Sequence, residues 1–251
     1  MASTRFLDVA INGRYFLVLD GMLIHLYEKR NEDFVLMKAF ERKTVYAQIL
    51  PHCSRIYILT MDQQGELFIL FNEMDDWKEI GIGSVDKTAS MLRACRCPPN
   101  MRFGCIIKGV VHVYELIIDE RPHFLPLRRY MSHQQIVSFD FTCNETVWCA
   151  TAKEIIKYSA NKNTSLFLKN LSSDSMIKVI KASPVSPDTV SILFEDSSIS
   201  IFNESQILNK ISTVQNVKDM QWSPLGDALC IEGDRIEIVE EITHNVWKSI
   251  E

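Results

Sequence analysis

The sequence predicts an all-β protein built from six repeats of a four-stranded unit, and three observations support this prediction. The first is a motif made of an apolar residue, any residue, an apolar residue and a large apolar residue. The second is its spacing, because successive copies begin 43, 44, 45, 43 and 37 residues apart. The third is that three other short apolar runs accompany each copy. The motif lies at 24–27, 67–70, 111–114, 156–159, 199–202 and 236–239.

The first strand of each unit is expected to end in a turn that contains proline, glycine or asparagine. Proline fixes φ and has no N–H to give to a central ladder, so it marks the end of a strand. Glycine and asparagine supply the conformations that turns require. The segments are VAING (9–13), AQILPHC (47–53), ACRCPPN (94–100), DFTCNE (140–145), KASPVSP (181–187) and QWSPLG (221–226).

The second strand precedes each copy of the motif across a tight turn that usually carries glycine or aspartate, as hairpins do. Its segments are FLVLDG (16–21), IYILTMDQQG (56–65), GCIIKG (104–109), VWCATAK (147–153), VSILFED (190–196) and LCIEGD (229–234). The motif itself is the third strand, and it is apolar at most positions, as strands covered on both faces are. We therefore expect a buried core that includes Val111, Val113, Ile199, Ile201, Ile236 and Ile238.

A polar turn and a fourth run complete each unit: FVLMKAF (34–40), WKEIGIG (77–83), HFLPLRRY (123–130), TSLFLKN (164–170), ILNKIST (207–213) and NVWKSI (245–250). Four short strands repeated about every 42 residues are typical of a β-propeller, whose stacked sheets bury both faces. We predict one domain over 1–251, with blades near 4–43, 44–88, 89–132, 133–174, 175–215 and 216–251. A seventh blade would have to come from another segment. The alternative is a β-sandwich or a two-domain all-β protein.

The repeated units resemble WD repeats, in which the third strand ends in a large apolar residue followed by aspartate. The segment EDSSISIFN (195–203) is the most similar, with Asp196 in the turn and Phe202-Asn203 in place of Trp-Asp. Tyr27-Glu28 and Tyr114-Glu115 stand at the same place in two other copies. No copy has Trp-Asp, and only Ser132-His133 corresponds to the family's Gly-His pair, so its Asp–His–Ser hydrogen bonds are expected to be mostly missing. The resemblance implies a WD-like propeller.

The composition indicates a globular chain in a reducing compartment. The 251 residues are 47% hydrophobic and 24% charged, and the net charge of −5 with a pI near 5.7 argues against a generally basic nucleic-acid binder. The seven cysteines show no disulfide framework. No secretory signal is recognised at the start of the chain and no apolar stretch approaches the roughly 20 residues that span a bilayer. We therefore expect a cytoplasmic or nuclear protein that is not inserted in a membrane.

The motifs that would carry catalysis or hold a cofactor are incomplete, so no enzyme activity, cofactor or metal is expected. Cys95 and Cys97, with Cys105 nearby, lack the second ligand pair of a zinc site, and we interpret them as small core residues. The segment GIGSVDK (81–87) lacks the pattern of a phosphate-binding loop and is interpreted as a connector. The six histidines are scattered, there is no G-x-S-x-G turn, and no series of charged residues recurs at equivalent blade positions.

One basic cluster is the candidate for partner binding. The segment RPHFLPLRRYMSH (121–133) carries Arg121, Arg128 and Arg129 with Phe124 and Tyr130 interleaved. Arginine with aromatic residues is the composition of interaction hot spots and of single-strand nucleic-acid platforms. The alternative is an outer strand whose arginines are simply solvated. Further basic residues that would join this cluster, if their connectors share its face, are Arg42, Lys43, Lys87 and Arg93.

The function predicted from these observations is a non-enzymatic scaffold for protein–protein interactions, a WD-like subunit or module of a larger intracellular complex. This step rests on analogy with the fold. The alternative is a nucleic-acid-contacting accessory subunit, in RNA processing or chromatin, that uses the arginine and aromatic cluster. Replacing Arg128 and Arg129 by glutamate is expected to weaken partner binding without lowering the melting temperature.

The two ends of the sequence predict how the repeats close. The first unit begins directly at its inner strand, near 5–10, and the last unit ends with its outer strand, near 245–248. No strand is left to complete the last blade from the N-terminus. We therefore expect six blades without a strand-exchange latch, and a partner or a second copy covering the gap between the first and last blades.

Overall fold

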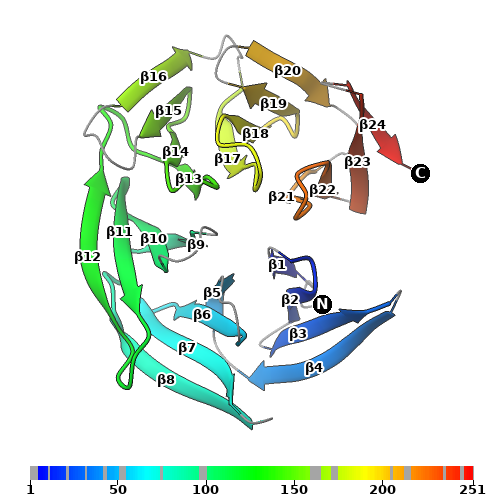
Figure 1. Ribbon diagram of the computed structural model, residues 1–251. Helices are drawn as coiled ribbons and strands as arrows, with labels where there is room; N and C mark the ends of the chain where they lie inside the picture. Colours follow the sequence, from blue (N-terminus) through cyan, green and yellow to red (C-terminus); the bar gives the residue numbers. More distant parts are fainter. Residues whose placement is uncertain are drawn as a thin grey trace. The chain divides into compact units, whose positions relative to one another are not determined.

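The computed structural model describes most of the chain, and in the described residues every regular element is a β-strand (Figure 1). These residues are 5–10, 12–20, 23–31, 33–41, 44–50, 55–73, 76–95, 101–158, 165–170, 175–203, 206–211, 216–233, 236–243 and 246–250. The all-β class predicted from the sequence is confirmed. The strands form six sheets of four strands each.

The first of two compact units comprises residues 1–108 and 112–129. Its first sheet has the order β1 (Arg5–Val9), β2 (Tyr15–Asp20), β3 (Leu23–Arg30) and β4 (Asp33–Glu41). The second has the order β5 (Thr44–Leu50), β6 (Tyr57–Asp62), β7 (Glu66–Glu73) and β8 (Asp76–Ser84). The third has β9 (Ser90–Ala94), β10 (Arg102–Ile107), β11 (Val110–Ile117) and β12 (His123–Tyr130) in the same order.

The second compact unit comprises residues 109–111 and 130–251, so it includes one end of β11 and of β12. Its sheets also follow chain order. They are β13 (Ser138–Phe141), β14 (Val147–Ala150), β15 (Glu154–Tyr158) and β16 (Ser165–Asn170); β17 (Ile177–Ala182), β18 (Thr189–Phe194), β19 (Ile199–Asn203) and β20 (Gln206–Ile211); and β21 (Asp219–Trp222), β22 (Ala228–Glu232), β23 (Ile236–Thr243) and β24 (Val246–Ile250).

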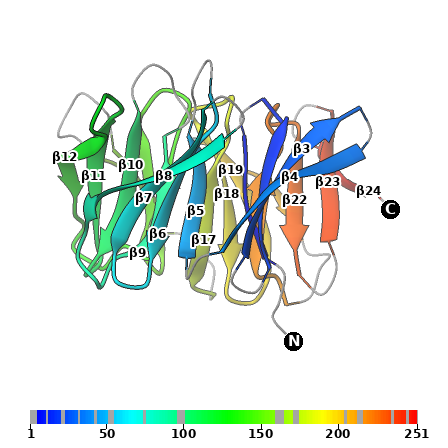
Figure 2. The same ribbon diagram turned by 90° about the horizontal axis from the view of Figure 1, so that it is seen from below.

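Within each unit the first strands of neighbouring sheets lie side by side. β1 contacts β5 and β5 contacts β9, while β13 contacts β17 and β17 contacts β21. The outer strands therefore lie at the far edge of each sheet, where they pair with a single neighbour (Figure 1). Figure 2 shows the strands of each sheet running side by side between turns at their two ends. This arrangement leaves the outer strands and the turns as the surfaces on which side chains meet solvent.

The core of the first unit explains the nearly continuous apolar runs of its second sheet. Ile58 and Leu70 pack with Leu17, Leu26 and other residues of the first sheet. Their neighbours along the chain, represented by Leu59 and Ile69, pack with residues of the third sheet, including Leu92, Phe103 and Tyr114. Successive side chains of a strand point to opposite faces, so a sheet between two others is apolar on both. Burying each such side chain stabilises the fold by about 1.5–3 kcal/mol.

The second unit repeats this logic in its middle sheet. Ile192 and Phe202 pack with Trp148, Ile155 and other residues of the sheet before it. Leu193, Ile199 and Ile201 pack with the sheet after it, against residues such as Met220, Trp222 and Leu229. The strands of this middle sheet therefore place side chains in two hydrophobic cores, one on each face of the sheet.

The predicted core residues are mostly confirmed, with one correction. Val111, Val113, Ile199 and Ile201 are buried, whereas Ile238 is 45% exposed. In β23 the buried residue is Val239, which lies opposite the fully buried Leu229, while Ile238 lies opposite Cys230. The prediction for Ile238 is wrong because a shift of one residue along a strand turns a side chain to the other face. The side chain of Ile236 lies outside the described residues.

Each of the six blade ranges expected from the sequence contains one of the six sheets. In the described residues the last sheet consists of β21 to β24, and no further strand is paired onto β24. The absence of a latch agrees with this topology as far as the described chain extends. The gap between first and last blades stays a prediction.

Candidate interaction surfaces

The strand β12 carries most of the residues expected to bind a partner. It is the outer strand of the third sheet, so one of its edges is unpaired in the sheet order. Arg121, in the turn before the strand, is exposed, and its backbone N–H donates a hydrogen bond to Asp119 Oδ1 at 2.9 Å. Arg129 is also exposed, whereas Arg128 is half-buried and already makes contacts. The structure therefore places two freely accessible guanidinium groups on this strand and its preceding turn.

The two aromatic residues of the cluster do not lie open on the surface as the sequence analysis expects. Phe124 packs edge-on against Phe103 and Tyr114, with ring centroids 5.5 and 5.2 Å apart. Tyr130 is 8% exposed, and its ring lies 4.8 Å from that of Tyr158. Both rings are directed inward because apolar partners on neighbouring strands are within contact distance. Tyr130 is therefore buried, and Phe124 is partly buried against the core.

Two leucines that the sequence analysis did not select are exposed beside the arginines. Leu125 is 48% exposed and Leu127 is 44% exposed, and Pro126 between them is exposed as well. The signal that could have found them is the Leu-Pro-Leu sequence itself, because proline is tolerated only in edge strands and so marks the strand as an outer one. We use the name β12 surface for Arg121, Leu125, Leu127, Arg128 and Arg129.

The other basic residues considered for this cluster are not brought to it by any described contact. Arg42 and Lys43 lie outside the described residues. Lys87 is exposed in the connector between β8 and β9. Arg93 is half-buried on the inner strand β9, where its Nη1 donates to the Leu92 carbonyl at 3.2 Å and its buried Nε has no hydrogen-bond partner. Arg93 thus belongs to the interior of the unit.

Burial shifts the pKa of several titratable groups, and the charge of Arg129 adds to the shift of one of them. The pKa of His112 on β11 is lowered because burial disfavours the imidazolium ion and because the positive charge of Arg129 adds to this effect. Burial raises the pKa of Tyr114 to about 12 and that of the Cys105 thiol to about 12. Burial also raises the pKa of Cys149. These cysteines are protonated thiols at neutral pH, which makes them poor nucleophiles and poor metal ligands.

No group of three or more histidine, cysteine or acidic side chains suited to a metal ion occurs in the described chain. The cysteines that the structure describes, Cys95, Cys105, Cys143, Cys149 and Cys230, are free thiols. Cys97 lies outside the described residues.

One pair in the second unit brings a histidine within ion-pair distance of a carboxylate, although Glu154 Oε2 makes no hydrogen bond. His133 Nε2 lies 3.4 Å from Glu154 Oε2, and Glu154 is buried in the hairpin between β14 and β15. Ser132 Oγ lies 3.4 Å from the other ring nitrogen of His133. The sequence analysis identified Ser132-His133 as the remaining counterpart of the Gly-His pair, and the structure gives this histidine an acidic partner. The partner was missed because glutamate stands where aspartate was expected.

The structure also shows polar residues that recur on the inner strands, which the sequence analysis did not find. In the first unit the Ile49 N–H donates to Asp8 Oδ2 at 2.7 Å, and the Ala94 N–H donates to Gln48 Oε1 at 3.4 Å. These bonds join residues 41 and 46 positions apart, which is close to the repeat length. The recurring groups satisfy the backbone of the next sheet, so they hold neighbouring sheets together.

The second unit has the same device at its inner strands. Ser138 Oγ accepts a hydrogen bond from the Ile180 N–H, and Asp140 Oδ2 accepts one from the Ala182 N–H, each at 3.0 Å and each across 42 positions. Lys181 Nζ then donates to Gln221 Oε1 on the following sheet at 3.1 Å. A polar residue is therefore used on each of these inner strands to bond to the next sheet.

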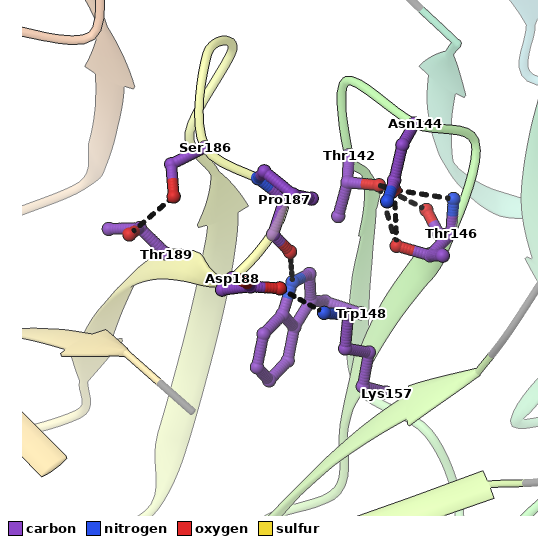
Figure 3. Close-up of polar contacts among 9 residues, drawn as sticks. All are labelled: Thr142, Asn144, Thr146, Trp148, Lys157, Ser186, Pro187, Asp188 and Thr189. Carbon is purple, nitrogen blue, oxygen red and sulfur yellow. Dashed lines mark hydrogen bonds and ion pairs between the residues drawn. The ribbon is translucent and has the colours of Figure 1, made fainter. Parts of the chain in front are cut away.

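A second connection between sheets lies nearer the hairpin turns and involves Trp148 (Figure 3). The buried indole donates its Nε1–H to the Pro187 carbonyl at 3.1 Å. Lys157 Nζ lies 5.4 Å above the same ring and forms an ion pair with Asp188 at 2.6 Å. Figure 3 shows that the indole and the ammonium group come from one hairpin, and that they meet the Pro187 carbonyl and the Asp188 side chain of the next sheet. This set of contacts joins the β13–β16 sheet to the β17–β20 sheet.

The comparisons with known proteins agree with this architecture. No protein-family model matches the chain, and no curated protein matches its sequence. Among solved structures, Kluyveromyces lactis Hsv2 has a TM-score of 0.64 at 12% identity, over 95% of this chain and 74% of that one. A chain of the Mitotic Checkpoint Complex has a TM-score of 0.64 at 11% identity, over 98% and 76%. Saccharomyces cerevisiae Sqt1 has a TM-score of 0.61 at 15% identity, over 92% and 69%.

These similar structures are WD40 β-propellers, so the fold of this chain is a WD-like β-propeller. The identities are low enough that the likeness concerns the fold alone. A search of the described residues for membrane-spanning helices finds none with the length and hydropathy to cross a bilayer.

Proposed function

We propose that this chain is a non-enzymatic protein-interaction module, a WD-like propeller within a larger assembly in the cytoplasm or nucleus. The observation that carries the proposal is the β12 surface, where exposed leucines lie beside exposed arginines on a strand held by its sheet. Apolar side chains that remain exposed next to arginine have the composition of protein-binding hot spots. Similar propellers occur in multi-protein structures, as in the Mitotic Checkpoint Complex.

The rigidity of the strand supports a binding role. β12 belongs to a four-stranded sheet, and Phe124 anchors it to the core through Phe103 and Tyr114. Side chains on such a strand are already held close to one arrangement, so a partner orders little of the protein when it binds. β12 is therefore held to the core by Phe124, while Leu125, Leu127 and Arg129 are exposed to a partner.

The charge of the β12 surface favours an acidic partner. Arg121, Arg128 and Arg129 stand in a chain whose net charge is −5. Burial is the main cause of the lowered pKa of His112, and the positive charge of Arg129 adds to it. We infer a partner segment with carboxylates placed around apolar side chains that cover Leu125 and Leu127.

The test compares two variants that carry the same change of charge. Arg121 and Arg129 are replaced by glutamate in the first, because both are exposed, and Arg128 is left in place because it has contacts of its own. Lys153 and Lys218, exposed in the second unit, are replaced by glutamate in the control. Tagged full chains are used to purify partners, and the partners are quantified by mass spectrometry.

We expect the Arg121→Glu/Arg129→Glu variant to recover stable partners at least about tenfold less efficiently, because each hot-spot arginine contributes more than about 1 kcal/mol. The Lys153→Glu/Lys218→Glu control should recover them as the wild type does, and both variants should keep the wild-type melting temperature. Equal recovery by both variants would contradict the proposed surface.

A nucleic-acid partner is the alternative, and the orientation of the aromatic rings does not favour it. Stacking platforms need open ring faces, whereas Tyr130 is buried and Phe124 is partly buried against Phe103 and Tyr114. Fluorescence anisotropy with mixed-sequence single-stranded RNA tests this directly. Binding that falls steeply between about 50 and 200 mM salt, and that the Arg121→Glu/Arg129→Glu change abolishes, would replace the protein-scaffold proposal.

A further inference from the structure

The outer strand of the first sheet, β4, has an unusual surface. β4 pairs with β3 alone in the sheet order, so its other edge is unpaired there. Phe34, Val35 and Leu36 follow one another and are 58%, 37% and 49% exposed. Runs of three consecutive exposed apolar residues are avoided in stable soluble domains unless they have a function. No feature of the fold requires this run to be apolar, since the chain buries its core elsewhere.

The exposed run occupies both faces of the sheet. Phe34 contacts the ring of Phe16 edge-on at 5.0 Å, and Leu36 lies opposite Tyr27, which in turn lies opposite Phe16. Phe34 and Leu36 therefore share one face of the sheet. Val35 points to the other face, because successive residues of a strand alternate.

The core of the first unit begins only after this run. Met37 is the extra residue of a bulge, since Leu36 lies opposite Tyr27 and Lys38 opposite Leu26. Met37 and Phe40 pack against the core shared with the second sheet, whereas Phe34, Val35 and Leu36 are not part of it. The segment Asp33–Leu36 is thus a regular, extended edge that the neighbouring sheet of the unit does not cover.

The other outer strands whose burial is described are protected at the same place. The exposed residues of β8 are charged residues, serine or glycine, among them Asp76, Lys78 and Glu79. β12 has exposed leucines, but Pro126 stands between them and cannot donate a hydrogen bond to an added strand. Charges and proline are the usual means by which proteins prevent pairing at a sheet edge. β4 has neither within Phe34–Leu36.

The charges around this edge are mainly positive. Arg14 and Arg30 both bind the buried carboxylate of Glu28, with Arg30 Nε and Glu28 Oε2 2.7 Å apart. Their side chains are still 59% and 61% exposed. Over 28–38 together with Arg14, the sequence has four cations, Arg14, Lys29, Arg30 and Lys38, and three carboxylates, Glu28, Glu32 and Asp33, of which Glu32 lies outside the described residues.

We propose that the Asp33–Leu36 edge of β4 accepts an extended, apolar and acidic segment of a partner protein as an added β-strand. A helix or a globular surface placed on one face of the sheet would cover Phe34 and Leu36 or Val35, but not all three. An added strand alternates its own side chains, so it covers both faces while pairing with the backbone of β4. A second copy of this chain is a poorer occupant, because it would bring the same excess of cations to the same edge.

This inference rests on the proposed role as an interaction module, but it concerns a surface other than β12. The probe is a short synthetic peptide with central valines and threonine flanked by glutamates, labelled with a fluorophore. A peptide with lysines in place of the glutamates measures the contribution of charge. Binding to the full chain is followed by fluorescence anisotropy, and backbone pairing by hydrogen exchange of the β4 amides.

Three variants separate an added strand from other modes of binding. Phe34→Ser/Leu36→Ser alters one face and Val35→Ser alters the other. Val185→Ser/Leu225→Ser is the matched control, since it makes the same kind of change at exposed apolar positions that belong to neither proposed surface. Cross-strand pairs contribute about 0.2–1 kcal/mol each, so we expect the first variant to weaken binding by about tenfold and the second by about threefold.

The expected result is that both β4 variants weaken binding and the Val185→Ser/Leu225→Ser control does not. Saturating peptide should protect the β4 amides while leaving those of β8 unchanged. The lysine-flanked peptide should bind several-fold more weakly. Full binding by Val35→Ser together with loss in Phe34→Ser/Leu36→Ser would show docking on one face and overturn the proposal, as would unchanged exchange of β4. A dimer that light scattering detects and the β4 variants dissociate would assign the edge to a second copy instead. Full binding by both β4 variants, with loss of binding in the Arg121→Glu/Arg129→Glu variant, would move the acidic partner to the β12 surface and overturn the proposal.

Discussion

Replacing Trp148 by phenylalanine measures the strength of the connection between two sheets of the second unit. The indole is fully buried, donates a hydrogen bond to the Pro187 carbonyl at 3.1 Å, and packs edge-on against Phe202 with centroids 6.3 Å apart. Phenylalanine keeps an aromatic ring for Phe202 and for the ammonium group of Lys157. It removes the N–H donor and part of the ring volume, so the Pro187 carbonyl loses its partner and a small cavity remains.

The expected loss of stability follows from these two effects. A buried carbonyl left without its donor costs about 1–3 kcal/mol, and the smaller ring adds about 1 kcal/mol for lost packing. We therefore expect Trp148→Phe to lower the free energy of unfolding by about 2–4 kcal/mol. Asp188→Asn, by contrast, should cost less than about 1 kcal/mol, because the Asp188 side chain is 49% exposed and its ion pair with Lys157 is screened by water.

Urea unfolding followed by far-ultraviolet circular dichroism is the appropriate measurement, since it does not depend on tryptophan fluorescence. The control is Trp77→Phe in the first unit, where the ring packs edge-on against Phe40 and the described residues provide no partner for its indole N–H. An unchanged urea dependence would show that the variants differ in stability rather than in compactness. If Trp148→Phe and Trp77→Phe destabilised the protein equally, the hydrogen bond to Pro187 would not hold the two sheets together as argued.

Three further predictions test other contacts. Asp140→Ala should lower the free energy of unfolding by about 1–3 kcal/mol in urea titrations, because the Ala182 N–H loses its acceptor. Lys153→Ala at an exposed position is the control. An equal loss of stability in the two variants would contradict the role of Asp140 in joining the sheets. Ile201→Asp should unfold the second unit, as seen by loss of protected amides in hydrogen exchange, because it buries an unpaired charge; retained protection would argue against the core assignment. The hydrogen bond from Arg30, with a smaller contribution from Arg14, lowers the pKa of Glu28. The ionised carboxylate therefore stabilises the fold fully above its unfolded pKa of about 4.5, and this stabilisation is lost as the pH falls through the lower folded pKa. The difference in urea stability between wild type and Glu28→Gln should accordingly be constant near neutral pH and shrink below about pH 4.5, and a difference that grew in acid would have the wrong sign.

The sequence predicted the strand that carries the candidate cluster, and the binding role of that cluster stays a prediction. The fourth run of the third repeat, which includes Arg128 and Arg129, was expected to be an outer strand, and β12 is one. Whether Phe124 and Tyr130 or Leu125 and Leu127 face outward depends on which side of the strand meets the core. Local sequence does not determine that, because both pairs are apolar and the neighbouring strand that decides between them is distant in the chain.

The same limit applies to the polar residues. In the sequence, Asp8 and Asp140 are isolated carboxylates in short apolar segments. In the structure, each accepts a hydrogen bond from a backbone N–H of the next sheet, that of Ile49 or Ala182, which lies 41 or 42 residues along the chain. Glu154 became recognisable as the partner of His133 only once the hairpin placed the two side chains 3.4 Å apart. These roles depend on the packing of sheets and leave no signal within a single repeat.

The sequence by itself determined the repeat, the four strands in each unit and the inward direction of residues such as Val111 and Ile201, because a sheet covered on both faces must be apolar in nearly every inner position. Tertiary structure alone decided the register of β23, where Val239 is buried and Ile238 is exposed, and the exposure of Phe34, Val35 and Leu36 on β4. The physical reason is that the hydrophobicity of a side chain determines its tendency to leave water. The space between neighbouring sheets decides which apolar side chains are buried.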